Sequence, residues 1–206
     1  MTEDGVIKFH YDFTDSAIPA SSNIESLEKI RKILCKYNLI GVDKHGIGYG
    51  NLSLAVGNNG IFKKFIISAS QTGKYHELLP EQYVTVHSYD FSAFSVQASG
   101  INPPSSESLT HAAIYELAED IQAVIHVHHK PLWDFMIQNH YPVSANLEYG
   151  TREMAREVKK MQQQNAFENF PVLAMKGHES GVIAFGNSLQ NACDILMNLY
   201  DKVKTG

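Results

Sequence analysis

The chain has 206 residues, of which 44% are hydrophobic and 19% charged, a composition typical of a globular protein with a full core. Its formal net charge of −5 comes from interspersed acidic and basic residues, so it offers no basic field for a nucleic acid or an anionic membrane. No linker, charge block or internal repeat divides the sequence, and we therefore expect a single domain over residues 1–206.

Targeting signals and disulfides are not indicated. The N-terminus, MTEDGVIKFHYDF, lacks a positive region followed by an apolar stretch, and no apolar run approaches the ~20 residues that span a bilayer. We expect a cytoplasmic protein with no membrane and no nucleic-acid partner. Cys35 and Cys193 fall in separate segments that we expect to be helical, which favours two packed thiols over a disulfide.

The first half of the chain is predicted to begin with a helix and to continue with strands. Residues 22–38 carry apolar residues on one helical face, and Ser22 and Glu25 have the spacing of a capping box. Alternating apolar residues over 46–56 and 63–70, with the turn GNNG between them, predict two neighbouring strands. Residues 83–91 and 92–100 are expected to add further strands.

The second half alternates helices with strands. A helix is predicted after PPSSES, where Leu109, Ala113 and Leu117 have helical spacing. Further helices are predicted over 133–140, over 151–164 with Thr151 as the cap, and from about Ser188 onward. Strands are predicted over 121–128 and in the segments PVLAM and GVIAF. The interleaving predicts an α/β fold in which helices cover a sheet, and the strand-rich first half favours a mixed sheet over a purely parallel one.

Two histidines have the spacing of metal ligands. Side chains two residues apart in a strand point to the same face, so His126 and His128 can bind one ion. A catalytic zinc site typically has three protein ligands, and His178, in the turn GHESG between two short strands, is the best third candidate. The alternative is that each histidine is a hydrogen-bonded residue of the core.

A carboxylate and several polar loops complete the candidate site. Glu107 opens the helix that precedes the H-x-H strand, where it could act as general acid or base, or simply interact with its own helix terminus. His111, one turn later, could orient Glu107 or only pack. Three loops offer backbone N–H groups, amides and hydroxyls that suit a phosphate, although each also fits an ordinary turn: Gly50-Asn51, Ser70-Gln71-Thr72-Gly73 and Ser105-Ser106.

Six motifs, in this order along the chain, resemble the class II aldolase and adducin head-domain family, which includes fuculose-phosphate aldolase and ribulose-phosphate 4-epimerase. The motifs are GNLS (50–53), SQTG (70–73), PSSE (104–107) with His111, AVIHVH (123–128), YGTREMA (149–155) and GHES (177–180). The resemblance implies a three-layer α/β/α fold with a central mixed, largely antiparallel sheet. It also implies a homotetramer with active sites between subunits.

The resemblance further implies a site and a reaction. His126, His128 and His178 would hold Zn²⁺ or another divalent ion such as Mn²⁺, Fe²⁺ or Co²⁺, and Glu107 would be the catalytic carboxylate. The phosphate of a small sugar phosphate would be held by Asn51, Thr72, Gly73, Ser105 and Ser106, and Gly50 adjoins this set. The implied activity is a lyase reaction, retro-aldol cleavage through a metal-stabilised enediolate. Epimerisation, dehydration and decarboxylation are alternatives on the same site.

The sequence departs from the family pattern in several places. The turn of the third histidine reads Lys-Gly-His-Glu rather than Asn-His-Gly, and Leu54-Ala55-Val56 follow GNLS where an arginine is usual. Ala69-Ser70 stand before Gln71-Thr72-Gly73 where a Thr-Pro pair is common. The chain ends at Gly206, without the C-terminal tail that supplies a catalytic tyrosine in the aldolases. Tyr141, Tyr149 and Tyr200 are the candidate replacements.

Two rival functions follow from the same motifs. A serine hydrolase is excluded because a nucleophile elbow has glycines two residues before and two residues after the serine, and Ser180 in GHESG has neither. A non-catalytic, adducin-like assembly module remains, since the fold alone does not fix function. The presence of three histidines and Glu107 favours an enzyme, because an assembly module does not need four converging polar groups.

Overall fold

Strands from both halves of the chain form one sheet in the computed structural model, which describes residues 5–59 and 62–205. The strands are β1 (His10–Asp15), β2 (Gly41–Val42), β3 (Gly48–Tyr49), β4 (Asn51–Asn59), β5 (Phe62–Ser68), β6 (Tyr83–Asp90), β7 (Ser95–Ser99), β8 (Ala123–His128), β9 (Val172–Ala174) and β10 (Gly181–Gly186). The helices are α1 (Ser21–Lys36), α2 (Ser108–Tyr115), α3 (Lys130–Gln138), α4 (Arg152–Gln163) and α5 (Leu189–Thr205), with short 3-10 helices η1 (Thr72–Lys74) and η2 (Pro80–Gln82).

The main sheet has eight strands in the order β1-β7-β6-β5-β4-β8-β10-β9, and β2 and β3 form a separate pair. Every neighbouring pair in the main sheet is antiparallel except β1 and β7 at one edge, which are parallel. The prediction of a mixed, largely antiparallel sheet is therefore confirmed. The predicted hairpin partners are also found side by side, as β4 and β5.

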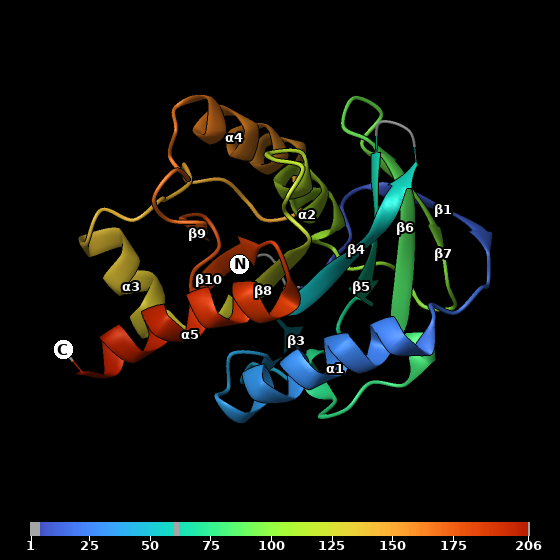
Figure 1. Cartoon of the computed structure of the whole chain (residues 1–206), viewed down its shortest axis with the longest axis horizontal. Coiled ribbons are helices and arrows are strands. Elements are labelled where there is room, and N and C mark those ends of the chain that lie inside the picture. The colour runs from blue at the N-terminus through green and yellow to red at the C-terminus, as the bar shows by residue number, and fades with distance from the viewer. Residues whose placement is uncertain (1–4, 60–61, 206) are drawn as a thin grey trace.

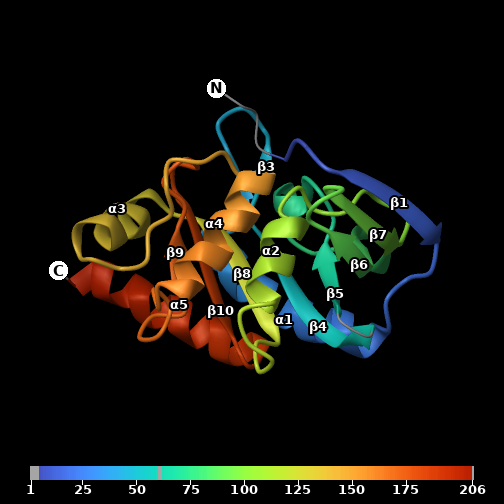
Figure 2. The same ribbon diagram turned by 90° about the horizontal axis from the view of Figure 1, so that it is seen from above.

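Helices cover both faces of the sheet (Figures 1 and 2). One core cluster joins the sheet to α2 and α4, and the other joins it to α1, α3 and α5. Alternation along β8 places Val124 in the first cluster and Ile125 and Val127 in the second. The three-layer α/β/α architecture is confirmed. Among the described residues, no helix combines the length and the apolar composition that a membrane span requires.

Some local expectations need correction. The predicted capping box of the first helix is wrong, because α1 begins at Ser21 and Ser22 lies inside its first turn, while the N-cap is Ala20, which makes no side-chain hydrogen bond. Strand β1 and the pair β2 and β3 were not predicted.

Both cysteines are free, as expected. The first four residues of MTEDGVIKFHYDF, Gly60 of the GNNG turn and the terminal Gly206 lie outside the described residues.

A buried arginine joins α1 to the loop that follows β5. Arg31 is 1% exposed, and its guanidinium donates to the carbonyl oxygens of His76 (3.0 Å), Thr72 (3.1 Å) and Tyr75. The carboxylate of Glu28 lies 4.0 Å from Arg31 Nη1. A buried charge is tolerated only when it is paired and hydrogen-bonded, so these contacts fix the loop of residues 72–76 relative to α1.

We expect Arg31→Met to lower the free energy of unfolding by about 3–5 kcal/mol, because it leaves Glu28 and three carbonyl groups without their buried cation. Urea unfolding followed by circular dichroism measures this change. Lys32→Met is the matched control, because Lys32 pairs with Glu77 at 2.7 Å on the exposed surface and its loss should leave the free energy of unfolding nearly unchanged. Equal effects of the two substitutions would contradict the structural role of Arg31.

Candidate functional site

The register of β8 brings its two histidines to a shared position on the sheet. β8 lies between β4 and β10, so that His126 is opposite Asn51 and His128 is opposite Gly181. Both rings project from the face of the sheet that α2 and α4 cover, because they share the side of Val124. The prediction that they point to one face is confirmed. The neighbouring His129 instead caps α3, where its Nδ1 accepts a hydrogen bond from the Leu132 amide at 3.1 Å.

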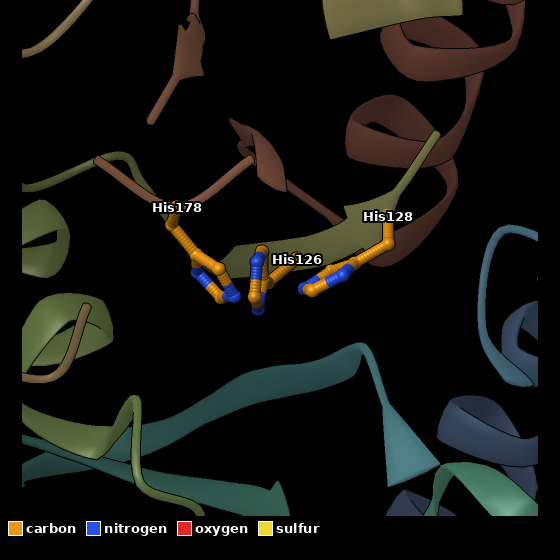
Figure 3. Close-up of side chains that lie close together, drawn as sticks. All are labelled: His126, His128 and His178. Carbon is orange, nitrogen blue, oxygen red and sulfur yellow. The ribbon is translucent and has the colours of Figure 1, made fainter. Parts of the chain in front are cut away.

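The turn between β9 and β10 carries the third histidine to the same place. The backbone closes there with hydrogen bonds from His178 N to Met175 O (3.0 Å) and from Gly181 N to His178 O (2.8 Å). Gly177 is required by close approach, since a Cβ at this position would lie 2.2 Å from the carbonyl oxygen of Leu147. Figure 3 shows the three imidazole rings converging from β8 and from this turn.

We refer to His126, His128 and His178 as the histidine cluster. The ring centroids are 5.0 Å apart for His126 and His128, 5.3 Å for His126 and His178, and 4.5 Å for His128 and His178. One nitrogen of each ring lies within 4.8 Å of one nitrogen of each of the others. His178 therefore belongs with the H-x-H pair, although about fifty positions separate them in the sequence.

The chemistry of His126 fits a metal ion. Its Nε2 is buried without a hydrogen-bond partner among the described residues, and its Nδ1 lies 3.3 Å from the side-chain nitrogen of Asn51. Burial, followed by the charges of His128 and His178, holds the pKa of His126 well below its usual range. The neutral imidazole that results is the form that binds metals, and a divalent ion would satisfy the nitrogen that the protein leaves bare.

Glu107 lies beside the histidine cluster. It is the N-cap residue of α2 and is 1% exposed, and its Oε1 is 3.6 Å from Nδ1 of His178. The hydroxyl of Ser105 accepts a hydrogen bond from the Glu107 amide at 3.2 Å, which fixes the backbone at the start of the helix. A carboxylate at this distance can orient the imidazole of His178 and can also reach a substrate that occupies the cavity.

The cavity beside the cluster contains most of the residues singled out from the sequence. Its lining consists of Gly5, Gly48, Tyr49, Gly50, Asn51, Ala69, Gln71, Ser105, Ser106, Glu107, His126, His128, Tyr149 and His178. In the part of the chain that the structure describes, Thr72 and Gly73 do not line this cavity. The hydroxyl of Thr72 donates to Ala69 O at 2.7 Å, and Gly73 packs so closely that a Cβ would lie 2.4 Å from Tyr49 O. Phosphate binding by these loops stays a prediction.

The sequence was compared with models of known protein families. Residues 42–133 match the family model described as the class II aldolase and adducin N-terminal domain. The matched stretch includes Glu107, His126 and His128. Over this stretch the chain belongs to the class II aldolase and adducin family. His178 lies beyond the matched stretch and is placed beside the other two histidines by the fold.

Solved structures similar to this family member share its fold. An L-fuculose 1-phosphate aldolase has 23% identity and a TM-score of 0.67, with 91% of this chain and 86% of that chain covered. A sugar-phosphate aldolase from Thermotoga maritima has 16% identity and a TM-score of 0.68, with 89% and 93% covered. The N-terminal class II aldolase domain of a conserved protein from Thermoplasma acidophilum has 12% identity and a TM-score of 0.61, with 92% and 96% covered. A comparison with curated protein sequences finds no match.

Two tyrosines flank the histidine cluster in this class II aldolase family member. Tyr49 stacks on His128, with ring centroids 5.0 Å apart and planes 14° apart, and the Tyr149 ring lies 4.6 Å from that of His178. Of the three tyrosines considered as replacements for the family's tail residue, Tyr149 lines the cavity. Tyr141 packs against Phe135 and Phe170, and Tyr200 against Tyr37 and His129.

Sequence reasoning missed Tyr49 and Gly5 as lining residues. Tyr49 directly precedes the GNLS motif, which is the signal that could have found it. Gln71 belongs to the polar loop predicted over 70–73 and does line the cavity, with a left-handed backbone φ of 57° that no local pattern indicates. Gly5 belongs to an N-terminal segment without any motif.

His111 does not orient Glu107 through a hydrogen bond. Its Nδ1 lies 2.7 Å from the hydroxyl of Ser53, whose oxygen is also 2.8 Å from that of Tyr115, and its Nε2 has no hydrogen-bond partner within the described part of the chain. Burial lowers the pKa of His111 to about 3. The ring is therefore neutral in the folded protein and contributes to the core between α2 and the sheet.

This pKa makes stability depend on pH in a specific direction. Between pH values of about 6.5 and about 3, the unfolded chain binds a proton at His111 that the folded chain does not. The free energy of unfolding of the metal-free protein should therefore fall as the pH falls, by about 1.4 kcal/mol per pH unit for this residue. Urea unfolding between pH 5 and 7.5, compared with His111→Gln, isolates the contribution. Identical pH slopes for the two proteins would contradict it.

Proposed function

We propose that this protein is a metal-dependent lyase that cleaves a small hydroxy-ketone or sugar phosphate by a retro-aldol reaction. The observation that carries the proposal is the convergence of three imidazoles and a buried carboxylate on one cavity. Family membership supports it, and so do the similar structures of an L-fuculose 1-phosphate aldolase and a sugar-phosphate aldolase. The fourfold assembly and the cytoplasmic location stay predictions.

His126, His128 and His178 would hold the ion, and the side chain of Asn51 lies beside Nδ1 of His126. A bound Zn²⁺, Mn²⁺, Fe²⁺ or Co²⁺ ion would supply a Lewis acid for the oxygens of the substrate. The two flanking tyrosines, Tyr49 and Tyr149, would narrow the cavity around it, which favours a compact substrate.

The proton transfers of the reaction fall to Glu107. Retro-aldol cleavage breaks the bond between the carbon next to the carbonyl group and the adjacent hydroxyl-bearing carbon. A base removes the proton of that hydroxyl, and the hydroxyl-bearing carbon becomes the carbonyl of the released aldehyde. The electron pair of the broken bond stays with the ketone fragment. This fragment then takes up a proton. Glu107 is the carboxylate that lines the cavity and can serve as base and then as acid.

Substrate recognition would come from neutral groups. Three neutral residues line the cavity: Asn51, the first residue of β4, and Ser105 and Ser106, which lie in the loop before α2. Amides, hydroxyls and backbone N–H groups can bind the hydroxyl groups of a sugar and also the oxygens of a phosphate. Both substrate types belong in the test.

The test is a screen of the metal-loaded protein against ketose phosphates and short unphosphorylated hydroxy-ketones. Enzyme-coupled detection of aldehyde identifies cleavage, and proton NMR of the same mixtures detects epimerised or decarboxylated products. We expect aldehyde release from at least one substrate. Turnover without aldehyde would replace the lyase by one of the related reactions, and metal binding without any turnover would favour an assembly module.

A further inference from the structure

A short N-terminal segment contacts residues on two sides of the cavity. This strap, residues 5–8, precedes β1 and runs between the loop that follows β5 and the loop that precedes α4. Gly5 lines the cavity together with Ala69 and Gln71 on one side and Tyr149 on the other. The strap is therefore part of the candidate site, although nothing in its sequence indicates this.

The first end of the strap is held by the loop after β5. The hydroxyl of Ser70 donates a hydrogen bond to the carbonyl oxygen of Gly5 at 2.9 Å. The strap also packs against the side chain of Gln71, because a Cβ at Gly5 would lie 2.7 Å from Gln71 Cγ. Gly5 has φ of +79°, a conformation that glycine adopts without strain.

The second end is held by Lys8. Its ammonium group donates to the carbonyl oxygen of Tyr149 at 2.7 Å, lies 3.1 Å from Glu148 Oε1 and is 3.5 Å from the centre of the Tyr149 ring. The Lys8 side chain is only 19% exposed, so these contacts are stronger than those of an ordinary surface ion pair. The amide of Val6 adds a hydrogen bond to the Tyr149 hydroxyl at 3.2 Å.

These contacts couple the strap to the histidine cluster through Tyr149, whose ring lies 4.6 Å from that of His178. We propose that the strap is a wall of the substrate cavity and that Lys8 and Ser70 position it, so that together they set the largest ligand that can reach the histidine cluster. The inference rests on the proposed function, since it assumes that ligands bind at the ion held there.

The test uses two ligands with the same chelating group and different bulk, acetohydroxamate and benzohydroxamate. Each is titrated into the Co²⁺-loaded protein, and the visible absorption of the cobalt reports binding without any catalysis. The variant is Lys8→Met/Ser70→Ala. The control is Lys159→Met, because Lys159 also combines an ion pair (Glu116, 2.5 Å) with a ring contact (Phe91, 4.0 Å) but lies outside the cavity lining.

We expect the wild type to bind acetohydroxamate more tightly than benzohydroxamate, and the double variant to lower this preference about tenfold by admitting the larger ligand. Lys8→Arg, which keeps the cation, and Lys159→Met should keep the wild-type preference. An unchanged preference in the double variant, or in Ser70→Ala alone if the double variant does not fold, would overturn the proposal. Failure of the wild type to bind Co²⁺ would overturn the metal site itself, and the strap proposal with it.

Discussion

Glu107→Gln should leave the metal content of the protein unchanged and reduce turnover of its substrate by about 100- to 10,000-fold, the usual contribution of a general acid or base. The amide keeps the shape of the carboxyl group and stays beside His178, whose Nδ1 is 3.6 Å from Glu107 Oε1 in the wild type. It cannot take up a proton at neutral pH. The variant therefore separates proton transfer from the positioning of His178.

Metal content by plasma mass spectrometry and kcat measured on the same preparation test this prediction. Glu179→Gln is the matched control, because Glu179 is adjacent to His178 in sequence while its side chain is 72% exposed and pairs with Lys130 at 3.8 Å. We expect that variant to retain the wild-type rate. If Glu107→Gln keeps the wild-type kcat, the base is another group. If it loses the metal instead, Glu107 acts mainly by orienting His178.

His126→Ala should weaken metal binding by more than about 100-fold, since loss of an outer-shell partner alone typically costs 10- to 100-fold. The His126 ring is close to both other rings of the cluster, and its Nε2 has no hydrogen-bond partner in the part of the chain that the structure describes. Its removal leaves two histidines, one on β8 and one on the turn, which cannot complete a three-ligand site.

Isothermal titration of the metal-free proteins with Zn²⁺ measures this loss. His129→Ala is the control, because His129 is also a histidine close to His128 but caps α3 and does not face the cavity. Its substitution should cost about 0.5–2 kcal/mol of stability, as for other lost caps, and leave zinc affinity unchanged. Equal zinc affinity in the wild type and in His126→Ala would show that the ion binds elsewhere.

The part of the site that lies within one strand could be predicted from the sequence. The alternation of side chains along a strand is a local rule, so the shared face of His126 and His128 follows from their spacing. The convergence of His178 depends on the antiparallel pairing of β8 with β10, which places His128 opposite Gly181. Local patterns do not determine that pairing, so the GHESG turn made His178 only a candidate ligand, and the family resemblance supported that choice.

The walls of the cavity could not be predicted, for a physical reason. Tyr49 and Gly5 reach the cavity through long-range contacts, namely the stacking of Tyr49 on His128 and the hydrogen bond from Ser70 to Gly5. The same holds for edge strand β1, whose side chains are mostly exposed and which pairs with a strand about eighty-five residues away. Only tertiary structure brings such segments together.

The arrangement of the central helices and strands was easier to predict, because most carry a clear apolar period. The predicted cap of α4 is found, with Thr151 Oγ1 accepting from the Met154 amide at 3.2 Å. The capping box at Ser22 was wrong because α1 begins at Ser21, so that Ser22 lies inside the helix. Helix ends are uncertain by one or two residues, and a capping pattern can miss them by that much.

An anomalous difference map, recorded at the zinc edge from crystals of the zinc-loaded protein, tests the three-histidine metal site most directly. We expect one strong peak at about 2.0–2.1 Å from a nitrogen of each of His126, His128 and His178, next to the Glu107 carboxylate. Zinc bound only at other residues, with no peak at the three histidines under saturating zinc, would contradict it.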